Sequence, residues 1–456
     1  RRKGQLESIS CRDSISNLPD DILGIILSFP STKLAASTSV LSKRWKNLLP
    51  LADSSLDFDD SISLYPDHRD TAARSSAFAD FVDKTVALLS TCPIKTLSVN
   101  GRYEKSRVDD WIRVALQRSL SELHLRCPHR IDKDRVELLF RSKTLVKLTL
   151  SDGCVIEALP DGHMDFTEQP FMDEKINEDR FFPSLKSLYI GDIVIEESYY
   201  HKLILTCPVL EELFIHNDGE SHPPSWIGFA PCRTLKRLVI YYVVPPEYKD
   251  VYDDQEVCIG CPENLVYFEF SSYVHDVYND GGEMESLVEA RLDLRLLEST
   301  TSFDDYTETG EYNDLLVVNG FDDIFGDATI LLLRMITALH FGCKLFFTFD
   351  NLVTLSFESD KDKSWQVLPR LLRKTPKLQN LVIKGLLHRV TGRCGDVCPC
   401  YHRPKRKGVI DWRKEKVSCL PYLPLKVLEI SGYGGTCREI EQMRFFFWEA
   451  CNTSNS

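Results

Sequence analysis

The feature that most constrains the fold of this chain is a short apolar pattern that recurs along most of its length. Each copy reads apolar-x-x-apolar-x-apolar. The ten clear copies begin at Ile94, Leu120, Leu145, Leu185, Leu210, Leu235, Leu265, Leu352, Leu378 and Leu425. Five of the nine intervals between successive copies are 25 or 26 residues. A fixed period of this length predicts an array of similar structural units rather than one globular core.

The spacing within each copy predicts a short β-strand. The second and third apolar residues lie two positions apart, so their side chains point to the same side of an extended chain. Helical patterns precede several copies, at residues 78–89, 108–116, 135–140, 198–205 and 365–372. Prolines stand before four of the strands, at Pro93, Pro208, Pro262 and Pro376. Since proline ends a helix and keeps the preceding residue extended, each unit should run helix, turn, strand.

A single unit of this kind cannot bury its apolar side, so the units must stack. Stacking predicts an α/β solenoid with a parallel sheet and outer helices over residues 78–385. The period lies in the range of leucine-rich repeats. Two degenerate copies, Leu287-Ala290-Leu292 and Ile336-Leu339-Phe341, fit the 87-residue interval after Leu265. A base- and cysteine-rich stretch, a last strand motif and a helix at 438–450 follow, and we expect residues 386–456 to cap the array.

Composition excludes several classes of protein. No run of 18 apolar residues occurs, which excludes a membrane-spanning helix, and the first residues lack the apolar region of a secretory signal. Fifteen cysteines without an export signal predict free thiols in a reducing compartment. We therefore expect a soluble intracellular protein, in the nucleus, the cytoplasm or both.

The net charge of −13 argues against broad, charge-driven binding to nucleic acid. Residues 246–325 contain 21 acidic and 3 basic residues, whereas the rest of the chain contains 47 and 52. One segment therefore carries all the excess acidity. Such a block is typical of solvated loops, and less often it contacts a basic partner.

Residues 13–56 lack the repeat and predict a small module of three helices. Pro19 stands at a first helical position, with Asp20 and Asp21 in the first turn, where negative charge is favourable. Helical spacing then places one set of apolar residues on one face: Ile22, Leu23, Ile26 and Leu27. Further helices are expected at 32–37 and 39–49. About 40 residues cannot bury a self-sufficient core, so the module must dock on its own solenoid or on another protein.

This module resembles the F-box of plant F-box proteins. The resemblance rests on Leu18-Pro19-Asp20-Asp21-Ile22-Leu23 and on Ser39-Val40-Leu41-Ser42-Lys43-Arg44-Trp45. The segment around Leu425–Ile430, with Gly432–Gly435, Glu439–Gln442 and Phe445–Phe447, is similar to the FBD domain that accompanies such F-boxes. With the repeats between, the chain is identified as a member of the plant F-box/FBD/leucine-rich-repeat proteins.

The resemblance implies a substrate receptor of an SCF-type cullin–RING ubiquitin ligase that docks a Skp-type adaptor. Carried over by position, the adaptor-binding residues are Leu18, Pro19, Ile22, Leu23, Ile26, Leu27, Val40, Leu41 and Trp45. The protein substrate would bind the solenoid. One departure concerns the turn after the first helix, where Pro30 stands one place earlier than the family pattern has it. The first helix is therefore expected to end a residue early.

Other motifs have competing explanations. Cys258 with Cys261, and the cluster of Cys394, Cys398, Cys400 and His402, contain zinc-type ligands. The Cys-x-Cys and Cys-x-His steps of the second cluster are tight for one tetrahedral site, and no second paired half follows nearby. The first pair lies far off in the sequence, and Cys261 belongs to the repeated turn before a strand, so reduced loop cysteines are favoured. The basic run 403–407 fits a nuclear import signal or a phosphate contact, with a solvated loop as the favoured interpretation.

No sequence motif of a known catalytic site occurs, and no cofactor or metal is predicted. The prediction is a non-catalytic receptor subunit. The alternatives are a repeat scaffold or regulator that delivers no ubiquitin, and a receptor that also binds a small molecule. Strand alternation places several polar residues on the solvent side of the sheet, but such residues are expected there whether or not they bind anything: Glu122, Lys147, Ser187, Glu212 and Arg237.

Overall fold

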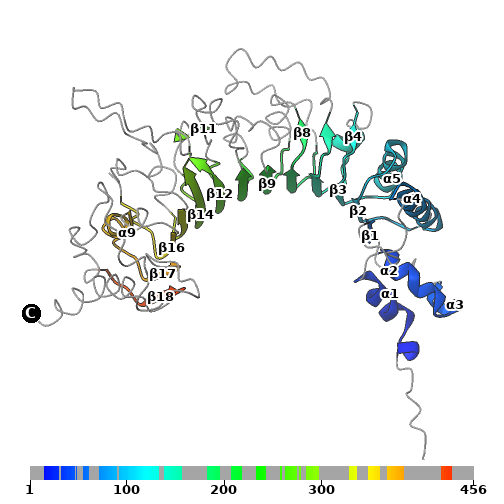
Figure 1. Ribbon diagram of the computed structural model, residues 1–456, viewed down its shortest axis with the longest axis horizontal. Helices are drawn as coiled ribbons and strands as arrows, with labels where there is room; N and C mark the ends of the chain where they lie inside the picture. The colour runs from blue at the N-terminus through cyan, green and yellow to red at the C-terminus, as the bar shows by residue number, and fades with distance from the viewer. Residues whose placement is uncertain are drawn as a thin grey trace, which may run out of the picture. The chain divides into compact units, whose positions relative to one another are not determined.

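The computed structural model confirms an α/β fold built on a large parallel sheet (Figure 1). The residues that the structure describes are 15–29, 32–46, 48, 55–60, 71–89, 92–132, 138–156, 182–195, 207–217, 233–242, 257–258, 262–274, 277–278, 284–296, 328–335, 348–359, 367–384 and 423–433. The chain divides into two compact units, Arg1–Val155 and Ile156–Ser456.

The sheet has 13 strands, and their order in space follows their order in the sequence. The first unit contributes β1 (Ser55–Asp59), β2 (Thr96–Asn100), β3 (Glu122–Arg126) and β5 (Lys147–Ser151). The second contributes β7 (Ser187–Gly191), β9 (Glu212–Asn217), β10 (Arg237–Tyr242), β12 (Tyr267–Val274), β14 (Glu289–Leu296), β15 (Ile330–Met335), β16 (Thr354–Ser359), β17 (Asn380–Lys384) and β18 (Val427–Ser431). Each repeat thus adds one parallel strand, as the period predicts.

The apolar residues of the repeat form the core of the sheet. Leu123 and Leu125 of β3, and Leu120 just before it, are fully buried, and the corresponding residues of the neighbouring strands pair with Leu123 and Leu125 in register. The alternate residues of the strands are partly or fully exposed for most of the sheet. Backbone bonds extend the ladder into the turn before each strand; the Glu211 N–H donates to the Lys186 carbonyl at 2.8 Å, for example. Neighbouring units are therefore joined by main-chain hydrogen bonds as well as by apolar packing.

Short strands lie beside this sheet. They are β4 (Arg130–Ile131), β6 (Val155–Ile156) and β8 (Val194–Ile195), and the parallel pair β11 (Val257–Cys258) and β13 (Val277–Tyr278). Of the predicted helices, those at 78–89, 108–116 and 365–372 are confirmed as α4 (Thr71–Leu88), α5 (Lys105–Gln117) and α9 (Val367–Leu372). Residues 138–140 are helical as expected. The helices predicted at 198–205 and 438–450 lie outside the described residues.

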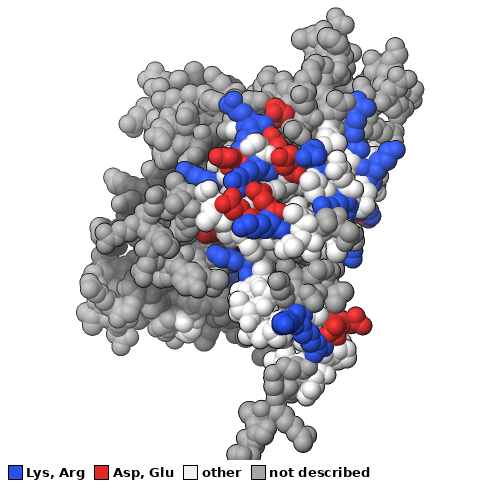
Figure 2. Space-filling view, turned by 90° about the vertical axis from the view of Figure 1, so that its right-hand side faces the viewer, with Lys and Arg blue, Asp and Glu red and all other residues white. Residues whose placement is uncertain are grey.

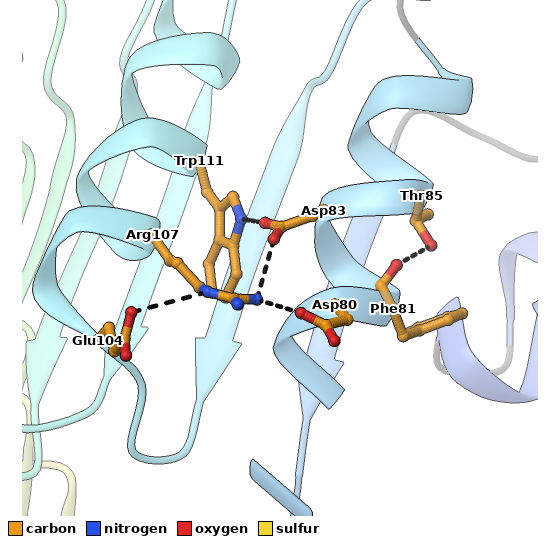
Figure 3. Close-up of polar contacts among 7 residues, drawn as sticks. All are labelled: Asp80, Phe81, Asp83, Thr85, Glu104, Arg107 and Trp111. Atoms are coloured by element: carbon orange, nitrogen blue, oxygen red, sulfur yellow. Dashed lines mark hydrogen bonds and ion pairs between the residues drawn. The ribbon is translucent and has the colours of Figure 1, made fainter. Parts of the chain in front are cut away.

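A polar cluster joins α4 to α5 (Figure 3). The Arg107 guanidinium on α5 bonds the carboxylates of Asp80 and Asp83 on α4 at 2.8 and 2.9 Å. The indole N–H of the buried Trp111 also donates to Asp83, at 2.7 Å. Since Asp83 accepts from both α5 side chains, it fixes how the two helices are aligned.

The structure differs from the sequence prediction at two strands. β1 precedes the predicted solenoid and takes in the last two residues of the predicted F-box segment, and it buries Leu56 and Phe58. β15 occupies the long interval at Ile330–Met335, before the degenerate copy expected from Ile336, and places Leu331 in the core. The residues of that expected copy lie outside the described part of the chain. Along the described residues, the helices are too short or too polar to cross a bilayer.

Candidate functional site

The N-terminal module is built from short helices, but the single helix predicted at 39–49 is replaced by a 3-10 helix that ends at Val40 and an α-helix over Lys43–Lys46. They are η1 (Ile15–Asn17), α1 (Asp20–Ser28), α2 (Thr32–Ser37), η2 (Thr38–Val40) and α3 (Lys43–Lys46). Pro19 precedes α1 in an extended conformation, with φ of −58° and ψ of 152°. α1 ends at Ser28, just before Phe29 and Pro30. α1 therefore ends directly before the early proline, although Phe29 itself keeps helical dihedrals, with φ of −77° and ψ of −43°, and its N–H donates to the Ile26 carbonyl.

Part of the predicted adaptor-binding set forms the core of this module. Leu23 and Leu27 are 0% and 3% exposed and pack with Ala35 and Leu48. Leu18 and Trp45 are partly buried against the same cluster. These two partly buried residues can contact a partner at their outer edges, whereas Leu23 and Leu27 act from beneath the surface by holding α1 in place.

The remaining apolar residues of α1 face outward. Ile22, Ile25, Ile26 and Phe29 are 42%, 55%, 41% and 83% exposed. Their spacing of i, i+3, i+4 and i+7 makes them one continuous stripe along the helix. The sequence prediction placed Ile22 and Ile26 with Leu23 and Leu27 on one face; the structure separates them into an outer and an inner stripe.

The connection from η2 towards α3 exposes a second pair of predicted residues. Val40 and Leu41 are 86% and 65% exposed, and Leu34 on α2 is 49% exposed. Pro19 is exposed as well. In the lower part of Figure 2, where the module lies, the described surface is largely uncharged apart from one group of basic and acidic side chains. Exposed large apolar side chains gathered in so small a module are typical of a protein-binding surface.

Sequence reasoning missed three residues of this surface, Ile25, Phe29 and Leu34. The signal was present, since Ile25 and Phe29 complete the helical spacing that begins at Ile22. α1 is apolar on two sides, and a sequence alone does not show which side the module uses for its own core.

Polar contacts hold the module together and join it to β1. Arg44 on α3 bonds the Asp20 carboxylate at the start of α1, with 2.7 Å between Nε and Oδ1, and donates to the Leu18 carbonyl. The Asp57 N–H in β1 donates to the Thr32 hydroxyl at 2.7 Å. The start of α1 is thus tied to α3, and α2 is tied to β1.

Two of the described thiols are made unreactive by burial, and no metal site is found among the described residues. They contain no group of three or more potential metal-ligating side chains. Burial raises the pKa of the Cys127 and Cys154 thiols to about 12, so both stay protonated and unreactive near neutral pH. Cys261 and the Cys394–His402 cluster lie outside the described residues, as does the basic run 403–407.

A second surface is the solvent side of the sheet. Each of the five polar residues predicted there stands at the first position of its strand and is at least partly exposed: Glu122, Lys147, Ser187, Glu212 and Arg237. In the second unit this side carries aromatic rings beside arginines. The Arg237 guanidinium lies 3.8 Å from the centre of the Tyr267 ring and 5.6 Å from that of Phe214.

Comparison with known proteins decides the family. The F-box domain matches residues 15–50, and the LRR repeats of FBD-associated F-box protein At5g56370 match residues 108–241. The chain is 43% identical to F-box/LRR-repeat protein At1g48400 of Arabidopsis thaliana over 96% of its own length and 90% of that protein's length. It is 41% identical to F-box protein At4g27050 of the same plant, over 95% and 90% of the two lengths. The chain belongs to the F-box/LRR-repeat proteins.

The family fits the two parts of the structure. The F-box match covers the helical module with the exposed stripe, and the LRR match covers α5 and the strands from β3 to β10. No enzyme family is indicated by these matches. The FBD assignment of residues 386–456 remains a prediction, since only 423–433 of them are described and they form β18.

Proposed function

We propose that this F-box/LRR protein is the substrate-recognition subunit of an SCF-type cullin–RING ubiquitin ligase. Its F-box would bind a Skp-type adaptor, and its repeat sheet would bind the protein to be modified. The observation that carries the proposal is the exposed stripe of Ile22, Ile25, Ile26 and Phe29 on an F-box whose own core is already filled by Leu23 and Leu27. An apolar stripe that the module does not use internally is available for a partner.

The proposed role requires no catalytic residue in this chain. A receptor that holds its substrate close to the charged conjugating enzyme makes the attack on the thioester effectively unimolecular. The chemistry would belong to other subunits. We place this activity in the nucleus, the cytoplasm or both, where protonated free thiols such as Cys127 persist.

Co-purification with a Skp-type adaptor tests the proposal. Ile26→Asp combined with Val40→Asp places two charges on the apolar surface without entering the module's core. Each buried apolar anchor of an interface contributes about 2 kcal/mol or more, so we expect adaptor binding to weaken at least about 30-fold. Leu23 is unsuitable for this test, because a charge at a fully buried position would unfold the module.

The matched control is Leu88→Asp, which makes the same type of change at a 75% exposed position on α4. This variant should bind the adaptor as the wild type does. Cullin should co-purify with Leu88→Asp and with the wild type. Equal binding by the wild type and the double variant would show that the stripe is not the contact. A folded wild type that binds no adaptor would favour the repeat scaffold that delivers no ubiquitin.

A further inference from the structure

Two opposite charges lie side by side on the solvent side of the sheet in the second unit. Glu212 is the first residue of β9, Arg237 is the first residue of β10, and the two are paired in register. Their chain neighbours Leu213 and Leu238 are fully buried, so alternation places both charged side chains on the opposite, solvent side. Since neighbouring strands lie about 4.8 Å apart, the two side chains start from adjacent points of the sheet.

The two charges do not pair with each other. Within the part of the chain that the structure describes, neither Glu212 nor the Arg237 guanidinium takes part in an ion pair or a side-chain hydrogen bond. The preceding residues differ, because the Glu211 carboxylate accepts from Lys186 at 2.8 Å and from Lys236 at 3.1 Å. A paired set of charges therefore stands just before β9 and β10, and an unpaired set stands one residue further along the chain.

Stacking explains why Arg237 does not turn towards Glu212. The guanidinium carbon lies 3.8 Å from the centre of the Tyr267 ring on β12, and 5.6 Å from that of Phe214 on β9. The Tyr267 ring is held in turn, because its O–H donates to Glu269. Arg237 is therefore drawn towards β12, while its N–H donors, which lie in the guanidinium plane, stay at the edges of the stack.

This pair of charges selects the chemistry of a ligand. A carboxylate bound to Arg237 would be repelled by Glu212, and an ammonium group bound to Glu212 would be repelled by Arg237. A primary carboxamide satisfies both, because its C=O can accept from the arginine and its NH₂ can donate to the glutamate. Its oxygen and nitrogen lie side by side, whereas the C=O and N–H of a trans peptide unit point in opposite directions. The pair therefore favours an Asn or Gln side chain over a charged side chain or a backbone peptide.

An apolar surface adjoins the charges on the same two strands. Phe214 and Val239 stand two residues further along β9 and β10, paired in register, and are half-buried on the solvent side. Tyr189 on β7 extends this surface, with its ring 6.3 Å from that of Phe214. In a segment that runs along the strands, a side chain two residues from the Asn or Gln would reach this surface, because alternate residues of an extended chain point the same way.

We propose that this face binds an extended segment of a protein partner that places an Asn or Gln amide between Glu212 and Arg237. A large apolar side chain two residues away packs on Phe214. The inference rests on the proposed function and deepens it, because the segment would belong to the substrate. Charge complementarity carries the choice of ligand: two adjacent, opposite and unpaired charges match a neutral group that has a donor and an acceptor side by side.

The test is fluorescence anisotropy of the full chain with a labelled, acetylated and amidated probe peptide, Ser-Thr-Gln-Ser-Leu-Thr-Ser. Glu212→Ala and Arg237→Ala should each weaken binding about tenfold, because each removes a hydrogen bond to a charged group. The matched controls are Glu211→Ala and Lys236→Ala, which remove the same charges from the neighbouring positions, where they are already paired. Each control should change binding less than about twofold.

A charge placed in the peptide separates a direct contact from a structural role. Replacing its Gln by Glu should weaken binding to the wild type about tenfold, because the new carboxylate meets Glu212. The same Glu peptide should bind Glu212→Ala more tightly than it binds the wild type, since only Arg237 then remains beside it. A merely structural role of Glu212 would instead weaken the binding of both peptides by the variant.

Three results would overturn the proposal. They are equal losses in Glu212→Ala and Glu211→Ala, tighter binding of the Glu peptide than of the Gln peptide by the wild type, and no binding of the Gln peptide by the folded wild type.

Adaptor co-purification of the same variants separates this inference from the proposed function. All four variants should retain the adaptor, because the changes lie on the repeat sheet and not on the F-box. Loss of peptide binding in Arg237→Ala with adaptor binding intact would support a separate recognition site. Peptide binding by a wild type that recruits no adaptor would support this inference and contradict the ligase assignment alone.

Discussion

At the residue scale, the protonation state of the buried His129 depends on its burial and on the charged side chains around it. Its Nε2 lies 3.2 Å from Oδ1 of Asp109, and the two side chains are 3% and 9% exposed. Lys105 bonds the other oxygen of Asp109 at 2.9 Å and Asp132 at 2.7 Å. Burial lowers the pKa of His129, although Asp109 acts in the opposite direction. The folded chain therefore favours neutral His129, with Lys105 already compensating the Asp109 charge.

The stability of the first unit should consequently fall as the pH falls through the usual titration range of histidine. Below about pH 6.5 the unfolded chain takes up a proton that folded His129 resists, so protons favour unfolding. His129→Gln keeps an N–H that can reach Asp109 but does not titrate. We expect the loss in urea midpoint between pH 7.5 and pH 5.5 to be smaller in this variant than in the wild type.

The control for this prediction is Arg130→Gln, at the exposed neighbouring position, since arginine does not titrate in this range. Its midpoint should shift with pH as that of the wild type does. An identical pH dependence in His129→Gln and the wild type would show that His129 is protonated as easily in the folded chain as in the unfolded one.

Individual residues were predictable from the sequence where burial alone decides their role. The repeat leucines are buried as their spacing predicts in the strands before β18, for example Leu123 and Leu213, both fully buried, whereas Leu428 in β18 is 36% exposed. The outer position of Ile22 and the inner position of Leu23 could not be assigned, because α1 is apolar on both sides. Arg237 and Tyr267 occupy the same position of successive copies, so their pairing across β10 and β12 follows from the repeat. The stacking of the guanidinium on the ring depends on the side-chain conformations, which the pattern does not encode.

At the scale of elements, the alignment of α4 with α5 depends on Asp83. This carboxylate accepts from Arg107 and from the buried indole of Trp111. Asp83→Ala leaves the Trp111 N–H without its acceptor, which costs roughly 1–2 kcal/mol, because water can partly replace a half-exposed carboxylate. Urea unfolding followed by tryptophan fluorescence measures this loss as a lower midpoint.

The matched change is Asp110→Ala on α5. Asp110 pairs with Arg113 on the same helix and is 59% exposed, so its loss should cost no more than about 0.5 kcal/mol. Comparable midpoints for the two variants would mean that the contacts of Asp83 between the helices add nothing beyond an ordinary surface ion pair.

Elements were predictable wherever the repeat is complete, and were missed where one of its apolar positions is weak. β1 has Leu56 and Phe58 in the strand, but a polar residue, Asp53, stands where the leading apolar residue should be. In β15 the leading position is Ala328, and the run from Ile330 to Leu333 lacks alternation. An unbroken apolar run does not show which residues face the core, so the register could not be predicted.

At the scale of the whole molecule, the F-box continues directly into the sheet of the first unit. β1 pairs with β2 over five residues, and its Asp57 N–H donates to Thr32 of the F-box. The Lys33 ammonium also lies 5.0 Å from the centre of the Phe78 ring on α4. β1 is therefore bonded to the F-box through Asp57 and to the repeats through its pairing with β2. A truncation can accordingly be made either before β1 or after it.

Two shortened chains separate these roles. A chain that begins at residue 51 loses the adaptor-binding surface but keeps β1, whereas one that begins at residue 61 also loses Leu56 and Phe58 from the core and uncovers the edge of β2. Both should fail to bind the adaptor. The second should aggregate more, because it leaves a strand edge open and also loses the buried Leu56 and Phe58, which exposes the apolar side chains that they cover. Size-exclusion chromatography with light scattering measures the difference; equal aggregation of both chains would show that the F-box itself, and not β1, protects this end of the sheet.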